Sequence, residues 1–251
     1  MNREKIHLST IDENAHRVAA EYGLGLEIAE FCTPWLLDTE FSQADPVIRE
    51  KMKCSRRFVL HAPFSEMFPC AIDPKVRQVT AERFRQVIAV AGRYGISKIV
   101  AHGGYNPRIY FPIWYTEQSV LFWREFVSQI PEGMVFCLEN VFEEEPEMLA
   151  EIVRQVHDPR IRMCLDVGHV NAYSHIPAAQ WLESCAELIE HFHIHNNHSS
   201  RDSHSQLWEG NLPMRQLLSS MEEKCPNATW TLEIPDGAPS VRWLLEEGLC
   251  G

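Results

Sequence analysis

Residues 134–166 read MVFCLENVFEEEPEMLAEIVRQVHDPRIRMCLD, and this stretch contains the repeating unit of the fold. Two short apolar runs, Met134–Glu139 and Ile161–Asp166, predict strands. Between them, Pro146–Val156 has apolar residues at helical spacing and begins with proline, which favours the first turn of a helix. The stretch therefore predicts a strand, a crossover helix and a second strand parallel to the first.

The same alternation recurs along the whole chain. The other predicted strands are Lys5–Leu8, Leu24–Ile28, Phe58–His61, Lys98–His102, His191–His195 and Thr229–Ile234. The other predicted helices are Asp12–Tyr22 with Gly23 at its end, Val76–Tyr94 opened by Asp73-Pro74 and closed by Gly95, Pro46–Lys53, Glu117–Ser128, Pro177–Glu190, Pro213–Lys224 and Val241–Glu247. Eight such units, without the glycine-rich phosphate loop of a doubly wound sheet, predict a (β/α)8 TIM barrel of parallel strands, with its active site at the C-terminal face. No linker or shift of composition interrupts it, so residues 1–251 are expected to form a single domain.

Charge and composition limit the classes of partner. The formal net charge of −12 would repel a polyphosphate backbone at long range, which argues against nucleic acid as a routine partner. The chain has no run of about 18 apolar residues, and Met1–Lys5 has no signal-peptide core, so a cytoplasmic protein without a membrane span is expected. The eight cysteines are scattered without a C-x-x-C pair, which favours reduced thiols over disulfides or a zinc–thiolate site.

Potential metal ligands collect where the predicted strands end. In a barrel of this type, catalytic groups lie at the carboxyl ends of the strands and in the loops that follow them. At those positions stand nine such residues: His61, His102, Glu139, Asp166, His169, His193, Asp202, His204 and Glu233. Imidazole with carboxylate, and no thiolate, suits zinc, manganese, iron or magnesium. Bound cations would also relieve the repulsion between several carboxylates in one barrel mouth.

Each of these residues also has a purely structural interpretation. A single histidine such as His61 is more often a hydrogen-bonded core residue than a ligand. Glu139 could cap a loop, Asp166 could form a turn with Gly168, and Asp202 could be solvated surface. His191 and His195 share a strand face with His193, so either could replace it as the ligand. What favours the metal interpretation is that all nine residues fall at the same end of successive strands.

At these positions the sequence resembles the xylose-isomerase-like barrels, a superfamily that includes endonuclease IV and many sugar isomerases and epimerases. The resemblance is carried, in order along nearly the whole chain, by His61-Ala62-Pro63-Phe64, Val100-Ala101-His102-Gly103-Gly104, Leu138-Glu139-Asn140, Leu165-Asp166-Val167-Gly168-His169, His193-Ile194-His195-Asn196-Asn197, Ser200-Arg201-Asp202-Ser203-His204, Glu209-Gly210-Asn211 and Leu232-Glu233. Two residues depart from the superfamily pattern: Asn196 stands where Asp is frequent, and Trp208 stands where Gly usually precedes the Glu-Gly pair.

The resemblance implies a ligand set. In the endonuclease IV pattern, His61 and His102 would hold one metal, and Glu139 would bridge it to a second. Asp166, His193 and Glu233 would complete the second metal site, and His169, Asp202 and His204 would hold a third. In the similar sugar epimerases, one metal is held by the equivalents of Glu139, Asp166, His193 and Glu233, and the two glutamates also move the proton. Zinc or manganese, one to three ions per chain, is therefore expected, with Asn140 and Trp208 as candidate substrate contacts.

Three functions follow from this interpretation. The first is isomerisation or epimerisation of a small sugar or sugar phosphate, with Glu139 and Glu233 as acid and base on opposite sides of the substrate. The second is a phosphoester hydrolase like endonuclease IV, in which three metals would activate water and stabilise the attacking and leaving oxygens. The third is a barrel that binds metal or sugar without turnover. The sequence leaves the substrate, the metal and the oligomeric state open.

Overall fold

The computed structural model describes residues 2–251; Met1, part of the amino-terminal stretch read above for a signal peptide, lies outside the described residues. Eight parallel strands close into a barrel in sequence order, because β8 pairs with β1 as well as with β7. The strands are β1 (Ile6–Ser9), β2 (Gly25–Ile28), β3 (Phe58–His61), β4 (Lys98–His102), β5 (Val135–Glu139), β6 (Ile161–Asp166), β7 (Ile189–Ile194) and β8 (Thr229–Leu232). The predicted TIM barrel is confirmed.

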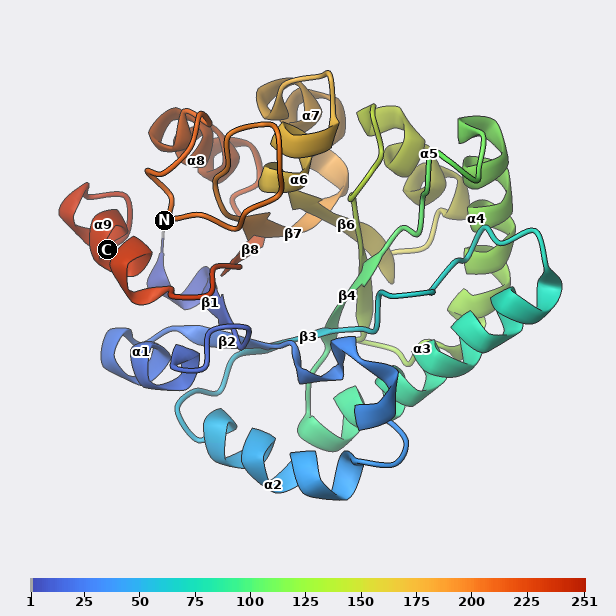
Figure 1. Ribbon diagram of the computed structural model, residues 1–251, viewed down its shortest axis with the longest axis horizontal. Coiled ribbons are helices and arrows are strands. Elements are labelled where there is room, and N and C mark those ends of the chain that lie inside the picture. Colours follow the sequence, from blue (N-terminus) through green and yellow to red (C-terminus); the bar gives the residue numbers. More distant parts are fainter. Residues whose placement is uncertain (1) are drawn as a thin grey trace.

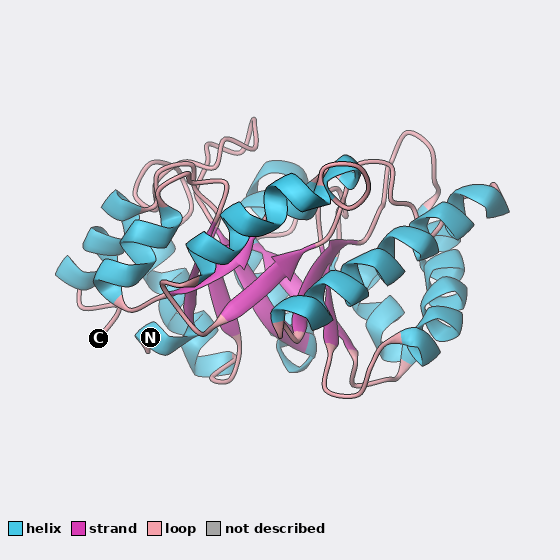
Figure 2. Ribbon diagram, turned by 90° about the horizontal axis from the view of Figure 1, so that it is seen from below, coloured by secondary structure: helices cyan, strands magenta, loops and turns pink. Residues whose placement is uncertain are grey.

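Helices surround the barrel on its outside (Figure 1). They are α1 (Ala15–Tyr22), α2 (Phe41–Met52), α3 (Pro74–Tyr94), α4 (Pro112–Phe126), α5 (Pro146–Val156), α6 (Val167–Tyr173), α7 (Ala178–Cys185), α8 (Met214–Lys224) and α9 (Ala238–Glu246). Seen from the side, the strands lie inside this helical layer, and long loops rise at one end of the barrel (Figure 2). Within residues 2–251, no helix combines the length and apolarity needed to cross a bilayer.

The hydrophobic core has two parts, as the alternation of side chains along barrel strands requires. The larger part fills the layer between strands and helices and includes Trp123, Trp181 and Trp230, all fully buried. The smaller part lies inside the barrel and consists of Val59, Val100, Cys137 and Cys164. Because Cys137 and Cys164 precede Glu139 and Asp166 by two residues, those carboxylates share the inward face. All eight cysteines are free, as expected.

The sequence placed several element boundaries wrongly. Helix α2 begins at Phe41 rather than Pro46, and α4 begins at Pro112 rather than Glu117. The predicted helix Pro177–Glu190 is too long, because α7 ends at Cys185 and Ile189 already pairs with Met163 of β6. Pairing with a neighbouring strand overrides local helical spacing here.

Two further differences lie beside the barrel mouth. His195 falls outside β7, which ends at Ile194. Helix α6 follows β6 directly and was not predicted as a helix; Asp166 caps it by accepting a hydrogen bond of 2.7 Å from His169 N. At seven residues, α6 is too short to show a helical period in the sequence.

Candidate metal centre

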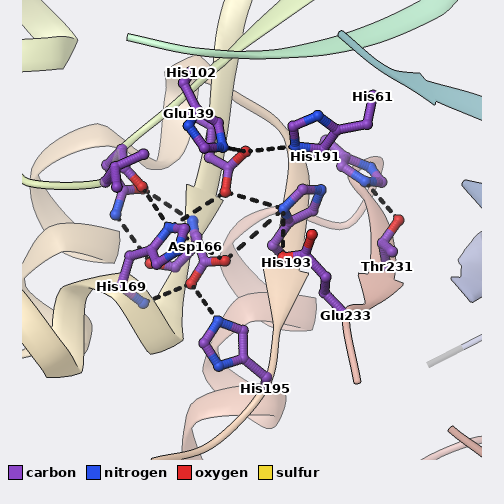
Figure 3. A network of polar contacts seen from close by, with 12 residues as sticks. His61, His102, Glu139, Asp166, His169, His191, His193, His195, Thr231 and Glu233 are labelled. Atoms are coloured by element: carbon purple, nitrogen blue, oxygen red, sulfur yellow. Dashed lines mark hydrogen bonds and ion pairs between the residues drawn. The ribbon is translucent and has the colours of Figure 1, made fainter. Parts of the chain in front are cut away.

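The nine predicted ligands converge at the carboxyl ends of the strands, around the barrel axis. Together with His195, they make up three of the groups in which one donor atom per residue lies within 4.8 Å of the others. The first donor set is His61, His102 and Glu139; the second is Glu139, Asp166, His193 and Glu233; the third is His169, His195, Asp202 and His204. Figure 3 shows His61 and His102 on one side of Glu139 and His193 on the other.

Glu139 joins the first donor set to the second. Its Oε2 lies 3.3 Å from His61 Nε2 and 3.4 Å from His102 Nε2, while its Oε1 lies 3.1 Å from His193 Nδ1. The carboxylate is fully buried, and Oε2 accepts no hydrogen bond. A buried carboxylate oxygen without a donor is costly unless a cation compensates it. This oxygen, which faces two imidazole nitrogens, has the surroundings of a bridging metal ligand.

The second donor set is the most deeply buried of the three. Asp166 and His193 are fully buried, and Glu233 is 9% exposed at the floor of the mouth. His193 Nδ1 lies 3.4 Å from Glu233 Oε2 and 3.8 Å from Asp166 Oδ2, and Asp166 Oδ2 has no hydrogen-bond partner. The carboxylates of Glu139, Asp166 and Glu233 thus surround one imidazole nitrogen. A divalent cation would balance their negative charge.

The third donor set lies at the outer rim. Asp202 Oδ2 lies 3.2 Å from His169 Nε2 and 3.1 Å from His204 Nε2. His195 Nε2 lies 3.6 Å from Asp202 Oδ1, and it also lies 3.2 Å from Asp166 Oδ1. His195 therefore stands beside His193 as an additional donor, rather than replacing it as the sequence had allowed.

Hydrogen bonds to main-chain carbonyl oxygens orient three of the imidazoles. The Nδ1 atoms of His61, His169 and His204 donate to the carbonyl oxygens of Ala62, Asn140 and Glu233, at 2.8, 2.9 and 2.8 Å. A carbonyl oxygen only accepts, so in each ring Nδ1 carries a proton, and Nε2 has a free lone pair whenever the ring is neutral. Those Nε2 atoms face Glu139 or Asp202. Such outer contacts are typical of metal-binding histidines.

Burial and neighbouring charges shift the pKa values of the ionisable side chains in the barrel mouth. Burial by itself would raise the pKa of Glu139, but His193 and His102 nearby hold that pKa well below its ordinary value. Burial opposes protonation of His204, yet its hydrogen bond to Asp202 raises its pKa to about 9. Burial lowers the pKa of His102 to about 4. In the chain alone, protonated histidines balance the carboxylates, and bound cations would replace those protons.

The two candidate substrate contacts do not line the mouth. Asn140 is buried; its amide donates 3.0 Å to Asp166 O and accepts 2.9 Å from Asp166 N, so it ties β5 to β6. Trp208 is 45% exposed, and its ring lies 6.3 Å from that of Trp243 in a hollow outside the mouth. Asn140 therefore lies beside the second donor set without lining the cavity at the mouth, and Trp208 lies apart from the donor sets.

The mouth opens into a cavity of about 410 Å³ lined by ligands of all three donor sets and by aromatic rings. Phe64 stacks on His102 at 4.7 Å, and Phe142 packs against Tyr173 at 4.8 Å. No lysine or arginine lines this cavity among residues 2–251. A larger cavity of about 780 Å³ lies beside α6, α7 and α8, and it contains none of the donor residues.

The family model for the xylose isomerase-like TIM barrel matches residues 17–247. The chain belongs to this family. Its curated relatives include the uncharacterized protein MJ1311 of Methanocaldococcus jannaschii, which is 30% identical over 181 residues, 66% of this chain and 60% of that protein. A second relative from the same organism, the uncharacterized protein MJ1188, is 25% identical over 70% of this chain and 66% of its own length. The chain therefore spans less than two thirds of either relative.

Several solved structures superpose over most of the chain. A D-tagatose 3-epimerase-like protein is 23% identical, with a TM-score of 0.76 over 98% of this chain and 97% of that one. The TTHB071 protein of Thermus thermophilus, soaked with ZnCl2, is 23% identical, with a TM-score of 0.74 over 96% and 97%. D-psicose 3-epimerase from Clostridium cellulolyticum H10, with D-tagatose, is 15% identical, with a TM-score of 0.72 over 90% and 83%. At these identities the likeness shows the shared fold.

Sequence reasoning missed Glu27 because it considered only the ends of strands. Glu27 is fully buried on β2, and it forms a further group of possible donors with His61, His193 and Glu233. The signal was present: a glutamate inside the apolar run Leu24–Ile28 must have a buried partner. His7 is 3% exposed, and its ring lies 6.1 Å from His191 inside the barrel.

Proposed function

We propose that this chain is a divalent-metal-dependent enzyme that isomerises or epimerises a small sugar or sugar phosphate. The observation that carries the proposal is the second donor set, in which Glu139 and Glu233 flank His193 and Asp166 at the floor of the mouth. The structural likeness to a D-tagatose 3-epimerase-like protein and to D-psicose 3-epimerase supports the same reaction class.

The donor atoms fit zinc or manganese. They are imidazole nitrogens and carboxylate oxygens, which both metals accept, and the described residues of the three sets contain no thiolate. The buried oxygens Glu139 Oε2, Asp166 Oδ2 and Asp202 Oδ1 have no hydrogen-bond partner, so each has a lone pair available for a cation. A bound divalent cation would polarise a substrate carbonyl and make the adjacent carbon-bound proton more acidic.

The two glutamates supply the proton transfers. Glu233 lines the cavity and is positioned to take the proton from the carbon next to the carbonyl. Glu139, whose Oε1 lies 3.1 Å from the same His193 Nδ1 that Glu233 faces at 3.4 Å, would return a proton either to the opposite face of that carbon or to the neighbouring carbon. The first route inverts a stereocentre and the second moves the carbonyl group. The aromatic rings of Phe64, Phe142 and Tyr173 would pack against the substrate and exclude water.

Incorporation of deuterium tests the reaction. Metal-loaded protein is incubated in deuterated water with a panel of ketoses and ketose phosphates, and carbon-bound deuterium is measured by NMR. Incorporation is expected with at least one sugar. We expect Glu233→Gln, which keeps an oxygen at that position, to lower the rate about 10²- to 10⁴-fold. No deuterium across the panel, with the metal confirmed present, would contradict the proposal.

The variant Glu139→Gln separates an enzyme from a barrel that only binds. Because Glu139 is proposed to carry a proton as well as to bind the cation, this variant should lose turnover. A simple sugar-binding protein would keep most of its affinity. Calorimetric titration with any sugar that exchanges deuterium gives that affinity, and circular dichroism checks that the variant is folded.

The first and third donor sets favour a second candidate, a phosphoester hydrolase. His61, His102, His169, Asp202 and His204 are surplus to a one-metal isomerase, yet all converge beside the second donor set. Elemental analysis discriminates between the candidates: about three cations per chain favour hydrolysis and about one favours isomerisation. A hydrolase should cleave simple phosphodiesters or abasic-site DNA; failure with three cations bound would eliminate it.

A further inference from the structure

Glu27 is a buried carboxylate one layer beneath the second donor set. It lies on β2, and its side chain has no exposed surface. Its Oε2 accepts a hydrogen bond of 2.7 Å from Thr231 Oγ1 and lies 3.2 Å from His193 Nε2. Its Oε1 lies 3.0 Å from the same nitrogen without a hydrogen bond. Removing a carboxylate from water is costly, so these contacts must compensate Glu27 inside the barrel.

His193 connects Glu27 to the metal centre. Its Nε2 faces Glu27, while its Nδ1 faces Glu139 at 3.1 Å and Glu233 at 3.4 Å. Figure 3 shows the ring between Glu139 and Glu233. A neutral imidazole has one N–H group, and the other nitrogen keeps the lone pair that can bind a metal. If Glu27 accepts the Nε2 proton, Nδ1 is left free for a cation in the second donor set.

This tautomer is opposite to that of the other oriented ligands. In His61, His169 and His204, Nδ1 donates to a main-chain carbonyl and Nε2 faces the centre. In His193 both nitrogens face carboxylates, Nε2 facing Glu27 and Nδ1 facing Glu139, and with the proton on Nε2 the nitrogens would exchange roles. A hydrogen bond to an ionised acceptor is about twice as strong as one between neutral groups. Glu27 therefore orients His193 more firmly than the carbonyls orient the other three rings.

A directed chain of hydrogen bonds orients Glu27 in turn. Lys98 Nζ can only donate, and it donates to Thr229 Oγ1 at 2.7 Å. The Thr229 hydroxyl lies 2.6 Å from His191 Nδ1 and donates to it when the His191 proton is on Nε2. His191 Nε2 donates to Thr231 Oγ1 at 2.9 Å, and the Thr231 hydroxyl donates to Glu27. An ammonium group begins this chain and a carboxylate ends it, and His191 Nε2 also lies 3.2 Å from Glu27 Oε2.

We propose that Glu27 is a positioning residue that fixes the tautomer and orientation of His193, so that His193 Nδ1 binds the cation of the second donor set. This inference rests on the proposed function, because it requires a cation at that position. Glu27 acts through His193 and does not touch the substrate cavity.

A different role for Glu27 predicts the opposite tautomer. Donor atoms of Glu27, His61, His193 and Glu233 also lie within 4.8 Å of one another, so Glu27 could itself be a ligand. In that case Nε2, the nitrogen that faces Glu27, would bind the cation, and Nδ1 would carry the proton. The proton position on His193 therefore decides between a positioning residue and a ligand.

The first experiment locates that proton. The full chain, labelled with nitrogen-15 in histidine and loaded with Zn²⁺, is studied by NMR, with His193→Gln used to assign the His193 signals. We expect the proton on Nε2 and the metal on Nδ1. A proton on Nδ1 with zinc on Nε2 would make Glu27 a ligand and overturn the inference.

The second experiment measures Zn²⁺ affinity by competition with a chromophoric chelator. For Glu27→Gln, the affinity of the second donor set should fall about 10- to 100-fold, the usual effect of removing an outer partner of a metal ligand. The matched control is Glu143→Gln, because Glu143 is also buried but bonds only to Tyr115 and to Val141 N. The control should bind Zn²⁺ like the unaltered chain.

A milder variant keeps the test decisive if Glu27→Gln does not fold. Thr231→Val removes the hydroxyl that donates to Glu27 and should weaken binding roughly 2- to 10-fold, as expected for one hydrogen bond. Unchanged Zn²⁺ affinity in the folded Glu27 variant, or in Thr231→Val where that variant is unfolded, would overturn the inference. If the unaltered chain binds no Zn²⁺ in the second donor set, the proposed function itself fails.

Discussion

At the scale of single residues, Asp202 is the one carboxylate of the third donor set, and it contacts both His169 and His204. The first two donor sets do not include Asp202. We therefore expect Asp202→Asn to lose about one cation per chain and to retain the others. Elemental analysis after desalting measures this, with Asp158→Asn, away from the mouth, as the control. A full complement of metal in Asp202→Asn would contradict the assignment.

Gly168 lies so close to the ring of His195 that no side chain fits at this position unless the ring moves. A methyl group at this position would collide with the ring of His195, which packs directly over the first turn of α6. Alanine is normally the better helix former, but here the overpacking should outweigh that gain. We expect Gly168→Ala to lower the free energy of unfolding by about 1–3 kcal/mol, as measured by urea denaturation. A stability equal to or above that of the parent would show that His195 moves aside without cost.

At the scale of elements, α3 contains a matched pair of glycines that separates helix propensity from backbone conformation. Gly92 lies within the helix and Gly95 caps it at a φ of 69°; neither has a neighbour within 4 Å of an added methyl group. We expect Gly92→Ala to stabilise the protein by roughly 0.5–1 kcal/mol. Gly95→Ala should destabilise it by about 1–2 kcal/mol, because the left-handed conformation strains alanine. Urea denaturation of both variants measures the difference, and effects of the same sign would refute this account of the cap.

The barrel and its crossover helices could be predicted at this scale because their signals are local. Asp73-Pro74 and Gly95 predicted the ends of α3, and Pro146 predicted the start of α5, since caps and proline act within one turn. The boundary between α7 and β7 could not be predicted. Ile189 belongs to β7 because it pairs with Met163, a partner 26 residues earlier in the chain. Local spacing contains no information about that partner.

At the scale of the whole molecule, the stability should depend on pH through His7. Burial lowers the pKa of this histidine to about 4, well below its ordinary value of 6.5. The unfolded chain therefore binds this proton more readily than the folded chain. The stabilisation from neutral His7 is complete above pH 6.5, and up to roughly 3 kcal/mol of it is lost as the pH falls toward 4.

The prediction for His7 is tested by comparing pH profiles of unfolding free energy, measured in urea. The variant His7→Gln should lose stability less steeply than the parent between pH 6.5 and 4. His157→Asn is the control: His157 is exposed and ends α5 at a φ of 53°, which asparagine tolerates. Parallel profiles for His7→Gln and the parent would contradict the prediction.

The metal centre should also support the barrel as a whole. The donor sets join side chains from β3 through β8, so a bound cation connects strands that are distant in the sequence. A cation present at a thousand times its dissociation constant would stabilise the folded chain by about 4 kcal/mol. Calorimetry should then show a fall of roughly 8–16 °C in Tm on adding a chelator. An unchanged Tm would indicate that the folded chain binds no cation tightly.

The sequence alone predicted the barrel and the nine residues whose donor atoms converge at the carboxyl ends of its strands. It could do so because alternation along strands, helix caps and strand ends are all local properties. Only the tertiary structure decided that His195 joins the third donor set and that Glu27 lies beneath the second. It also placed Asn140 and Trp208 outside the cavity at the mouth. These assignments depend on closure of the barrel, which brings β2 and β7 to the same interior although they are far apart along the chain.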